Sequence, residues 1–127
     1  MSAPEIEEFA RILVQRVRDA AIRSCDGELQ ASAESPVAKR WRDAARSNTP
    51  EEFARAAIPD IVDETVFHLL DAIDQGLLKI SFTASTGGTV DLTSDGLGEL
   101  SGWYAGSPGW RTMHAKERFV DDFSDLK

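Results

Sequence analysis

The sequence predicts one α+β domain over residues 1–127, mostly helical, with about four N-terminal helices, a β-hairpin and a short C-terminal helix. Up to residue 76, apolar side chains recur every three or four positions behind helix-start signals, as in amphipathic helices. From residue 76 onward lie eight of the nine glycines and two segments that alternate apolar with polar side chains, as strands do. A mass of 13.9 kDa fits one domain.

The first two predicted helices are marked by their start signals. The first begins at Ser2, which has the capping-box spacing to Glu5, and it ends near Gly27. Its apolar positions form one stripe: Ile6, Phe9, Ala10, Leu13, Val17, Ala20 and Ala21. After a polar loop, a second helix is expected from Pro36, because Ser35 offers a capping hydroxyl and proline suits the first helical position.

Two more helices are expected before the glycine-rich part of the chain. The third begins where Thr49 caps and Pro50 opens a helix. It is expected to end by Ile58, because Pro59 disfavours helical geometry in the residue before it. The fourth would run from Pro59 to Gly76, which suits the position just after a helix end.

The remaining elements are a hairpin and a last helix. Residues 78–83 and 89–93 alternate with period two around a turn that contains Gly87 and Gly88, which predicts an antiparallel hairpin. Its apolar face is expected to pack against the helices, because two strands alone are only marginally stable. The last helix is expected to use three apolar side chains: Phe119, Val120 and Phe123.

The formal net charge of −8 is unevenly distributed along the chain. Residues 1–48 contain eight basic and eight acidic side chains, whereas residues 49–127 contain six basic and fourteen acidic ones. A negative field repels nucleic acid and anionic membranes, so neither is expected as a partner. It attracts basic proteins, although solubility alone also explains such a charge.

Several features predict a cytoplasmic protein. No apolar run approaches the roughly 20 residues of a membrane-spanning helix, and the N-terminal residues lack the pattern of a secretory signal. Cys25 is the only cysteine, so no internal disulfide can form, which fits a reducing compartment. The segment order and acidic balance are similar to those of small cytoplasmic bacterial proteins, and no motif ties the chain to a named family.

The predicted helix from Pro59 to Gly76 carries the main candidate site. Its acidic side has no Lys or Arg between Ala56 and Leu78 and contains five acids: Asp60, Asp63, Glu64, Asp71 and Asp74. Phe67 projects into this side, and an aromatic anchor ringed by acids is typical of a site for a basic partner. The predicted partner-binding residues are therefore Asp63, Glu64, Phe67, Asp71 and Asp74. Alternatively, another element covers Phe67 and arginines of the first two helices pair with the acids.

A second candidate site is an aromatic cluster around a Gly-Pro turn. Its residues, predicted to bind a ligand in the alternative interpretation, are Trp103, Tyr104 and Trp110. Clustered aromatic rings can form the wall of a ligand pocket. They can equally close the open end of a small core, so both interpretations stand.

No catalytic residue, metal or cofactor is predicted. Glu64, His68 and Asp71 have a spacing that metal ligands can adopt, but no Cys pair or His-Glu-x-x-His pattern accompanies them. The glycine-rich stretch from Gly96 lacks the βαβ context of a dinucleotide site. Cys25 stands beside an aspartate, which raises the pKa of a thiol instead of activating it.

The leading hypothesis is a small, acidic, non-enzymatic protein-interaction domain. It would bind a basic protein through the acidic side of the Pro59–Gly76 helix, as an immunity protein or an adaptor would. The alternative is a domain or enzyme that binds a small molecule or metal near Trp103, Tyr104 and Trp110. A third hypothesis is a homo-oligomer in which an apolar helix face meets itself.

Overall fold

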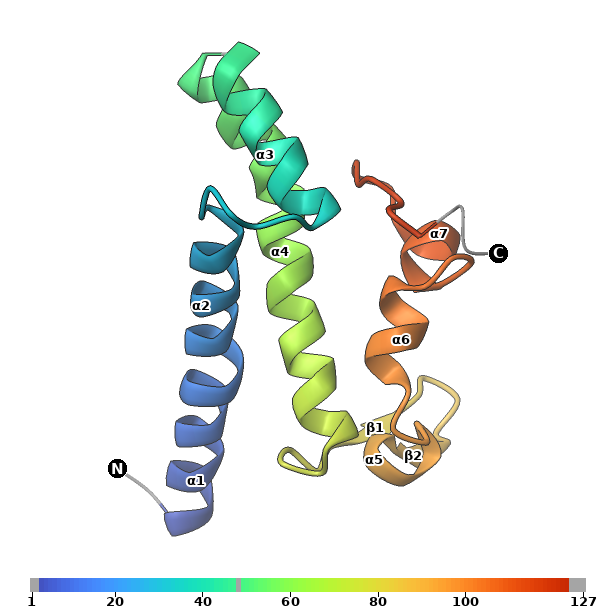
Figure 1. The fold of residues 1–127 in the computed structure, drawn as a ribbon. Helices are drawn as coiled ribbons and strands as arrows, with labels where there is room; N and C mark the ends of the chain where they lie inside the picture. The colour runs from blue at the N-terminus through green and yellow to red at the C-terminus, as the bar shows by residue number, and fades with distance from the viewer. Residues whose placement is uncertain (1–2, 48, 124–127) are drawn as a thin grey trace.

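The fold is built around one long central helix (Figure 1). The computed structural model describes residues 3–47 and 49–123. The elements, in chain order, are α1 (Pro4–Ile12), η1 (Leu13–Arg18), α2 (Asp19–Glu28), α3 (Pro36–Ser47), α4 (Pro50–Asp74), β1 (Ser81–Thr83), β2 (Thr89–Asp91), α5 (Leu92–Asp95), α6 (Leu100–Ala105) and α7 (Trp110–His114). The mostly helical α+β class is confirmed.

Helix α4 is flanked by other helices on two sides. The continuous N-terminal helix formed by α1, η1 and α2 lies along one side, and α6 lies along the other (Figure 1). Helix α3 packs beside the first turns of α4, and the hairpin with α5 follows its last turn. One cluster of buried side chains gathers near the end of α4: Val17, Ala72, Ile73, Leu78 and Leu100. Other buried residues lie on α3 and the first half of α4: Ala38, Trp41, Ala44 and Ala57. Among the described residues, no helix has the length and apolar character to cross a bilayer.

The N-terminal helix is continuous over residues 4–28 and contains a π-helical segment, η1. Its stripe is buried against α4 at Val17 and Ala21. The residue at the N-cap position is Ala3, which makes no side-chain cap hydrogen bond. Ser2, the predicted cap, lies outside the described residues.

Three other helix-end predictions are confirmed. Ser35 Oγ accepts a hydrogen bond from the Ala38 amide at 3.0 Å, and Thr49 Oγ1 accepts one from the Glu52 amide at 3.2 Å. Gly76 follows the end of α4 with a φ of 76°, a left-handed conformation that glycine adopts without a steric penalty. These signals are local, because each cap bonds within its own turn.

The helix break expected before Pro59 is wrong. Helix α4 runs through Pro59, so three continuous N-terminal helices form instead of four. Proline has no N–H, so the carbonyl of Arg55 loses its partner within the helix. Arg118 Nη2 donates to that oxygen at 2.6 Å, which satisfies it from outside the helix.

The predicted hairpin is confirmed, and the expected packing of its apolar face against the helices holds for only part of that face. Strands β1 and β2 pair antiparallel over three residues each, with Phe82 opposite Val90. Both of these side chains are exposed, at 56% and 42%. The other apolar residues of the predicted strands lie just outside the paired segments and contact the core: Leu78, Ile80 and Leu92.

The last helix is placed differently from the prediction. Helix α7 covers Trp110–His114, and residues 115–123 form no helix. Phe119 lies over the guanidinium of Arg111, with 4.9 Å between that group and the ring centroid. Val120 and Phe123 are exposed, so the three side chains do not form a buried helical stripe.

Candidate functional site

The acids on the acidic side of α4 turn toward different partners. Asp74 accepts hydrogen bonds from the amides of Leu100 and Ser101, at 2.8 Å and 3.0 Å. The Ser101 hydroxyl adds a third, at 2.8 Å. Because the first amides of a helix have no partner within it, Asp74 caps α6 from a neighbouring helix.

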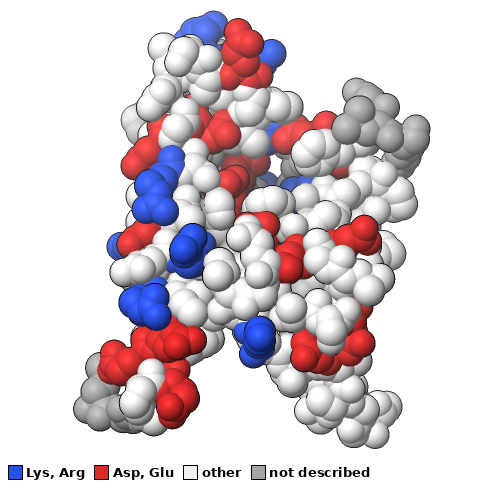
Figure 2. All heavy atoms as spheres, turned by 60° about the horizontal axis from the view of Figure 1, so that its bottom comes forward, with Lys and Arg blue, Asp and Glu red and all other residues white. Residues whose placement is uncertain are grey.

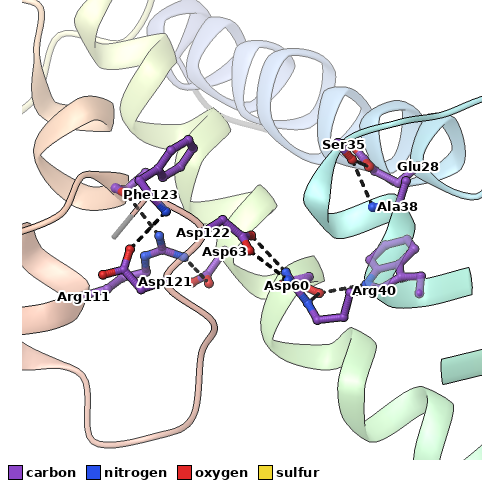
Figure 3. A network of polar contacts seen from close by, with 12 residues as sticks. Glu28, Ser35, Ala38, Arg40, Asp60, Asp63, Arg111, Asp121, Asp122 and Phe123 are labelled. Atoms are coloured by element: carbon purple, nitrogen blue, oxygen red, sulfur yellow. Dashed lines mark hydrogen bonds and ion pairs between the residues drawn. The ribbon is translucent and has the colours of Figure 1, made fainter. Parts of the chain in front are cut away.

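Asp60 belongs to a network that joins three parts of the chain (Figure 3). Arg40 Nη2 lies 2.8 Å from Asp60 Oδ1, and Arg40 Nη1 lies 2.9 Å from Asp122 Oδ1. The indole N–H of Trp41 donates to Asp60 Oδ2 at 2.8 Å. Hydrogen bonds from Arg40 to Asp122 and Asp60 raise the pKa of its guanidinium above the ordinary value. The alternative prediction, in which arginines of the first two helices pair with the acids, therefore describes Asp60.

Asp63 faces the C-terminal part of the chain. Its carboxylate accepts a hydrogen bond from the Tyr104 hydroxyl at 2.5 Å and another from Arg111 Nη1 at 2.9 Å. Arg111 Nη2 also donates to the carbonyl of Ala105 at 3.0 Å. Arg111 therefore links α7 to both α4 and α6.

The contact with Asp63 can be tested through the pKa of the Tyr104 hydroxyl. Burial first, and the Asp63 carboxylate second, raise the pKa of the Tyr104 hydroxyl above its ordinary value. The unfolded chain loses this proton near pH 10 while the folded chain still holds it, so stability should fall as the pH rises above about 10. Tyr104 is the only tyrosine, so its ultraviolet absorbance reports this titration directly.

The matched control for this titration is Tyr104→Phe. That variant should lose less stability than the parent between about pH 10 and pH 12, because it has no phenol to ionise. A Tyr104 that titrates at its ordinary pKa in the folded chain would contradict the contact with Asp63.

Glu64 and Phe67 are more accessible than these acids. The Glu64 side chain is 32% exposed and pairs with His68 over 3.2 Å between Oε1 and Nε2. The Ser24 hydroxyl lies 3.0 Å from the same histidine nitrogen. Phe67 is 36% exposed and meets the His68 ring edge-on at 5.8 Å. Phe67 thus contacts the ring of His68 and still reaches the surface.

The metal spacing noted in the sequence does not produce a cluster. Asp71 accepts a hydrogen bond from Gln75 at 2.6 Å, one turn beyond the pair formed by Glu64 and His68. Within residues 3–47 and 49–123, no three His, Cys, Asp or Glu side chains gather closely enough to hold a metal ion.

Burial, followed by the charge of Glu64, raises the pKa of Cys25, which disfavours its thiolate.

Three of the predicted partner-binding residues line one cleft of about 330 Å³ between α3, α4 and the C-terminal segment. We call it the acidic cleft, and its lining includes Pro36, Asp60, Asp63, Glu64, Phe67, Tyr104, Arg111, Asp122 and Phe123. Four carboxylates lie here against two guanidinium groups, those of Arg111 and of Arg40, which pairs with Asp60 and Asp122. The cleft therefore has a surplus of two negative charges and three aromatic rings.

No family model, curated protein or solved structure matches the chain. What the cleft does is inferred from this geometry.

The aromatic cluster divides between two environments. Trp103 and Trp110 pack together with ring centroids 6.1 Å apart, whereas the Tyr104 hydroxyl points to Asp63. Tyr104 and Trp110 line a separate cavity of about 650 Å³, which we call the apolar cavity, and Trp103 is not in its lining. Five of its ten other lining residues are apolar: Ile58, Pro59, Val62, Ala115 and Phe119. The other five are polar: Asp63, Arg111, His114, Glu117 and Arg118.

Three residues of the acidic cleft are not predicted as site residues by the sequence: Arg111, Asp122 and Phe123. All three reach the acidic cleft from the C-terminal segment, more than forty positions from α4 residues such as Asp63. No spacing rule relates residues so far apart, so no local signal marks them. Arg111 reaches α4 through its contact with Asp63. Asp122 and Phe123 reach the cleft where the segment returns toward α3 and Asp122 pairs with Arg40 (Figure 3).

Proposed function

We propose that the chain is a non-enzymatic, cytoplasmic protein-interaction domain, immunity-like or adaptor-like, whose acidic cleft receives a basic side chain of a partner protein. The observation that carries the proposal is the pairing of surplus negative charge with aromatic rings in a single cleft. A lysine or arginine is attracted both by carboxylates and by the faces of aromatic rings. The net charge of −8 would also speed the encounter with a basic partner.

The contacts distinguish the residues that maintain the shape of the cleft from those that can contact a partner. Asp60 and Asp63 are already paired with arginines, so they shape the cleft and hold its walls. Glu64 has a weaker partner in His68 and a more exposed carboxylate, so it is free to meet an incoming cation. Phe67 lines the same cleft and offers a partly exposed ring, the type of side chain that anchors interfaces.

The first test uses the double variant Glu64→Gln, Phe67→Ala. Two-dimensional amide NMR spectra would be recorded while N-acetyl-arginine methylamide or the lysine equivalent is added. The parent chain should show saturable shifts around the cleft, and the double variant should bind at least about tenfold more weakly, because it loses one charge pair and one ring contact.

The matched control for the cleft is Asp71→Asn. Asp71 lies on the same helix and was predicted to bind the partner, but it is absent from the cleft lining. This variant should bind like the parent, both in the titration and in capture of basic proteins from native extract. Equal weakening by both variants would assign the effect to overall charge and reject the cleft. Unchanged binding by the double variant would also reject the cleft.

The apolar cavity favours a second candidate function, the binding of a small molecule. Its volume of about 650 Å³ falls within the range of about 300–1,000 Å³ typical of ligand pockets. Val62→Trp would place a large ring at its wall. Binding of anilinonaphthalene sulfonate that quenches Trp110 in the parent and not in this variant would support a ligand site, and identical quenching would oppose it.

A further inference from the structure

The apolar stripe of the N-terminal helix is covered over only part of its length. Val17 and Ala21, in the later turns, are buried at 5% and 4% exposure. Ile6 and Phe9, on the same stripe in α1, are 54% and 47% exposed, and α1 contributes no buried residue. The described residues therefore leave the first turns of an amphipathic helix without a partner surface.

This stripe leads directly into a groove between the N-terminal helix and α4. The groove has a volume of about 360 Å³, and Leu13 belongs both to it and to the stripe. Ile22 and Ile61 line it as well and are 44% and 43% exposed. A continuous apolar surface of this kind on a small domain marks an interaction site.

The charges beside the stripe indicate what covers it. The first turns of α1 carry Glu5, Glu7 and Glu8. The turns that follow, as far as Arg23, are net positive, with one aspartate and four arginines: Asp19, Arg11, Arg16, Arg18 and Arg23. Figure 2 shows the acidic atoms at the projecting tip of this helix and basic atoms further along it. Two such helices side by side in parallel would oppose acid to acid, whereas an antiparallel pair opposes acid to arginine at both ends.

We propose that two copies of the chain pair through this surface, with their N-terminal helices antiparallel about a two-fold axis near Leu13. At 1.5 Å per residue, Ile6 lies about 10 Å from the axis, opposite the turn of the second copy that contains Ala20 and Ala21. Ile6 and Phe9 of each copy then cover the groove of the other. The contact is the same on both copies, so the assembly closes as a dimer.

The test is the mass in solution, measured by sedimentation equilibrium over a range of concentrations. The parent chain should reach twice the 13.9 kDa of one copy, and Phe9→Glu should remain at the mass of one copy. Phe9 is exposed within a single chain, so circular dichroism of this variant should match the parent. Phe82→Glu, which changes an equally exposed ring on the hairpin, is the matched control and should still dimerise.

Single cysteines test the orientation in a Cys25→Ser background. Leu13→Cys lies near the axis and should form a disulfide between copies. Ile6→Cys should not, because the two residues would lie roughly 20 Å apart. Cross-linking at both positions would indicate a parallel pair and overturn the arrangement.

A monomer at every concentration would overturn the dimer, as would a Phe9→Glu chain that still dimerises. If the monomer binds phosphatidylcholine vesicles and Phe9→Glu abolishes that binding, the stripe faces a lipid surface instead of a second copy. Equal dissociation by Phe9→Glu and Phe82→Glu would also reject this interface, because the effect would then follow from charge alone.

Discussion

Replacing Asp60 by Ala is expected to lower the free energy of unfolding by about 3 kcal/mol, the largest effect among the acids of α4. The Asp60 side chain is only 9% exposed and accepts hydrogen bonds from Arg40 and from the indole of Trp41. Its removal leaves the indole without this acceptor and Arg40 with Asp122 alone. Breaking one partner of a poorly solvated ion pair costs far more than the pair itself contributes.

Urea unfolding followed by tryptophan fluorescence and circular dichroism would measure this loss. Asp19→Ala is the matched control: its ion pair with Arg18 is exposed, so the change should stay within about 0.5 kcal/mol. Arg40→Met should destabilise the chain by a similar amount to Asp60→Ala. The double variant should lose much less than the sum, because both changes remove the same contact. An Asp60→Ala chain as stable as the Asp19→Ala chain would contradict the network.

The elements that the sequence predicted correctly are those whose cause is local. Ser35 and Thr49 bond to amides three residues away, and Gly76 needs only its own backbone conformation. The hairpin likewise follows from a short turn with Gly87, in a left-handed conformation, and Gly88. Spacing and residue type are sufficient for such features, because all the interacting atoms lie within a few residues.

Pro59 shows why a sound local rule failed. A proline inside a helix loses one hydrogen bond and disfavours the preceding geometry, so a break was the reasonable prediction. The freed carbonyl of Arg55 finds Arg118, which lies 63 residues away in the sequence. Packing of α4 against α3 and the N-terminal helix further stabilises the continuous helix. Nothing near Pro59 in the sequence reveals either contribution.

The acidic side of α4 was predicted as a position on a helix, but its role depends on distant partners. Helical spacing correctly placed the acids on α4, and it gave no information on which of them face other elements. Asp60 and Asp63 meet residues of α3, α6, α7 and the C-terminal segment. Among the described residues, the hydrogen-bond partners of Glu64 and Asp71 lie within one turn of the same helix or its cap. The cleft is formed by residues that are distant in the sequence, so helical spacing alone could not predict it. Binding of a partner through the cleft stays a proposal.

Replacing Asp74 by Ala is expected to lower the free energy of unfolding by about 2 kcal/mol. The change leaves two amides, of Leu100 and Ser101, without their acceptor at the start of a six-residue helix. Hydrogen exchange of these two amides should accelerate before the rest of the chain responds. Asp71→Ala is the matched control, because the hydrogen bond of Asp71 to Gln75, at the end of the same helix, is exposed, and its effect should stay within about 0.5 kcal/mol.

Asp74→Ala should also alter the acidic cleft, because Asp74 caps α6 and α6 carries a residue of the cleft wall. That helix carries Tyr104, whose hydroxyl bonds to Asp63 only while α6 keeps its place beside α4. If Asp74 holds the start of α6, Asp74→Ala should move the pKa of Tyr104 back toward its ordinary value, because the ring becomes more solvated. Asp71→Ala should leave that pKa raised. A Tyr104 titration unchanged by Asp74→Ala would mean that other contacts, such as those of Arg111, suffice to hold this wall of the cleft.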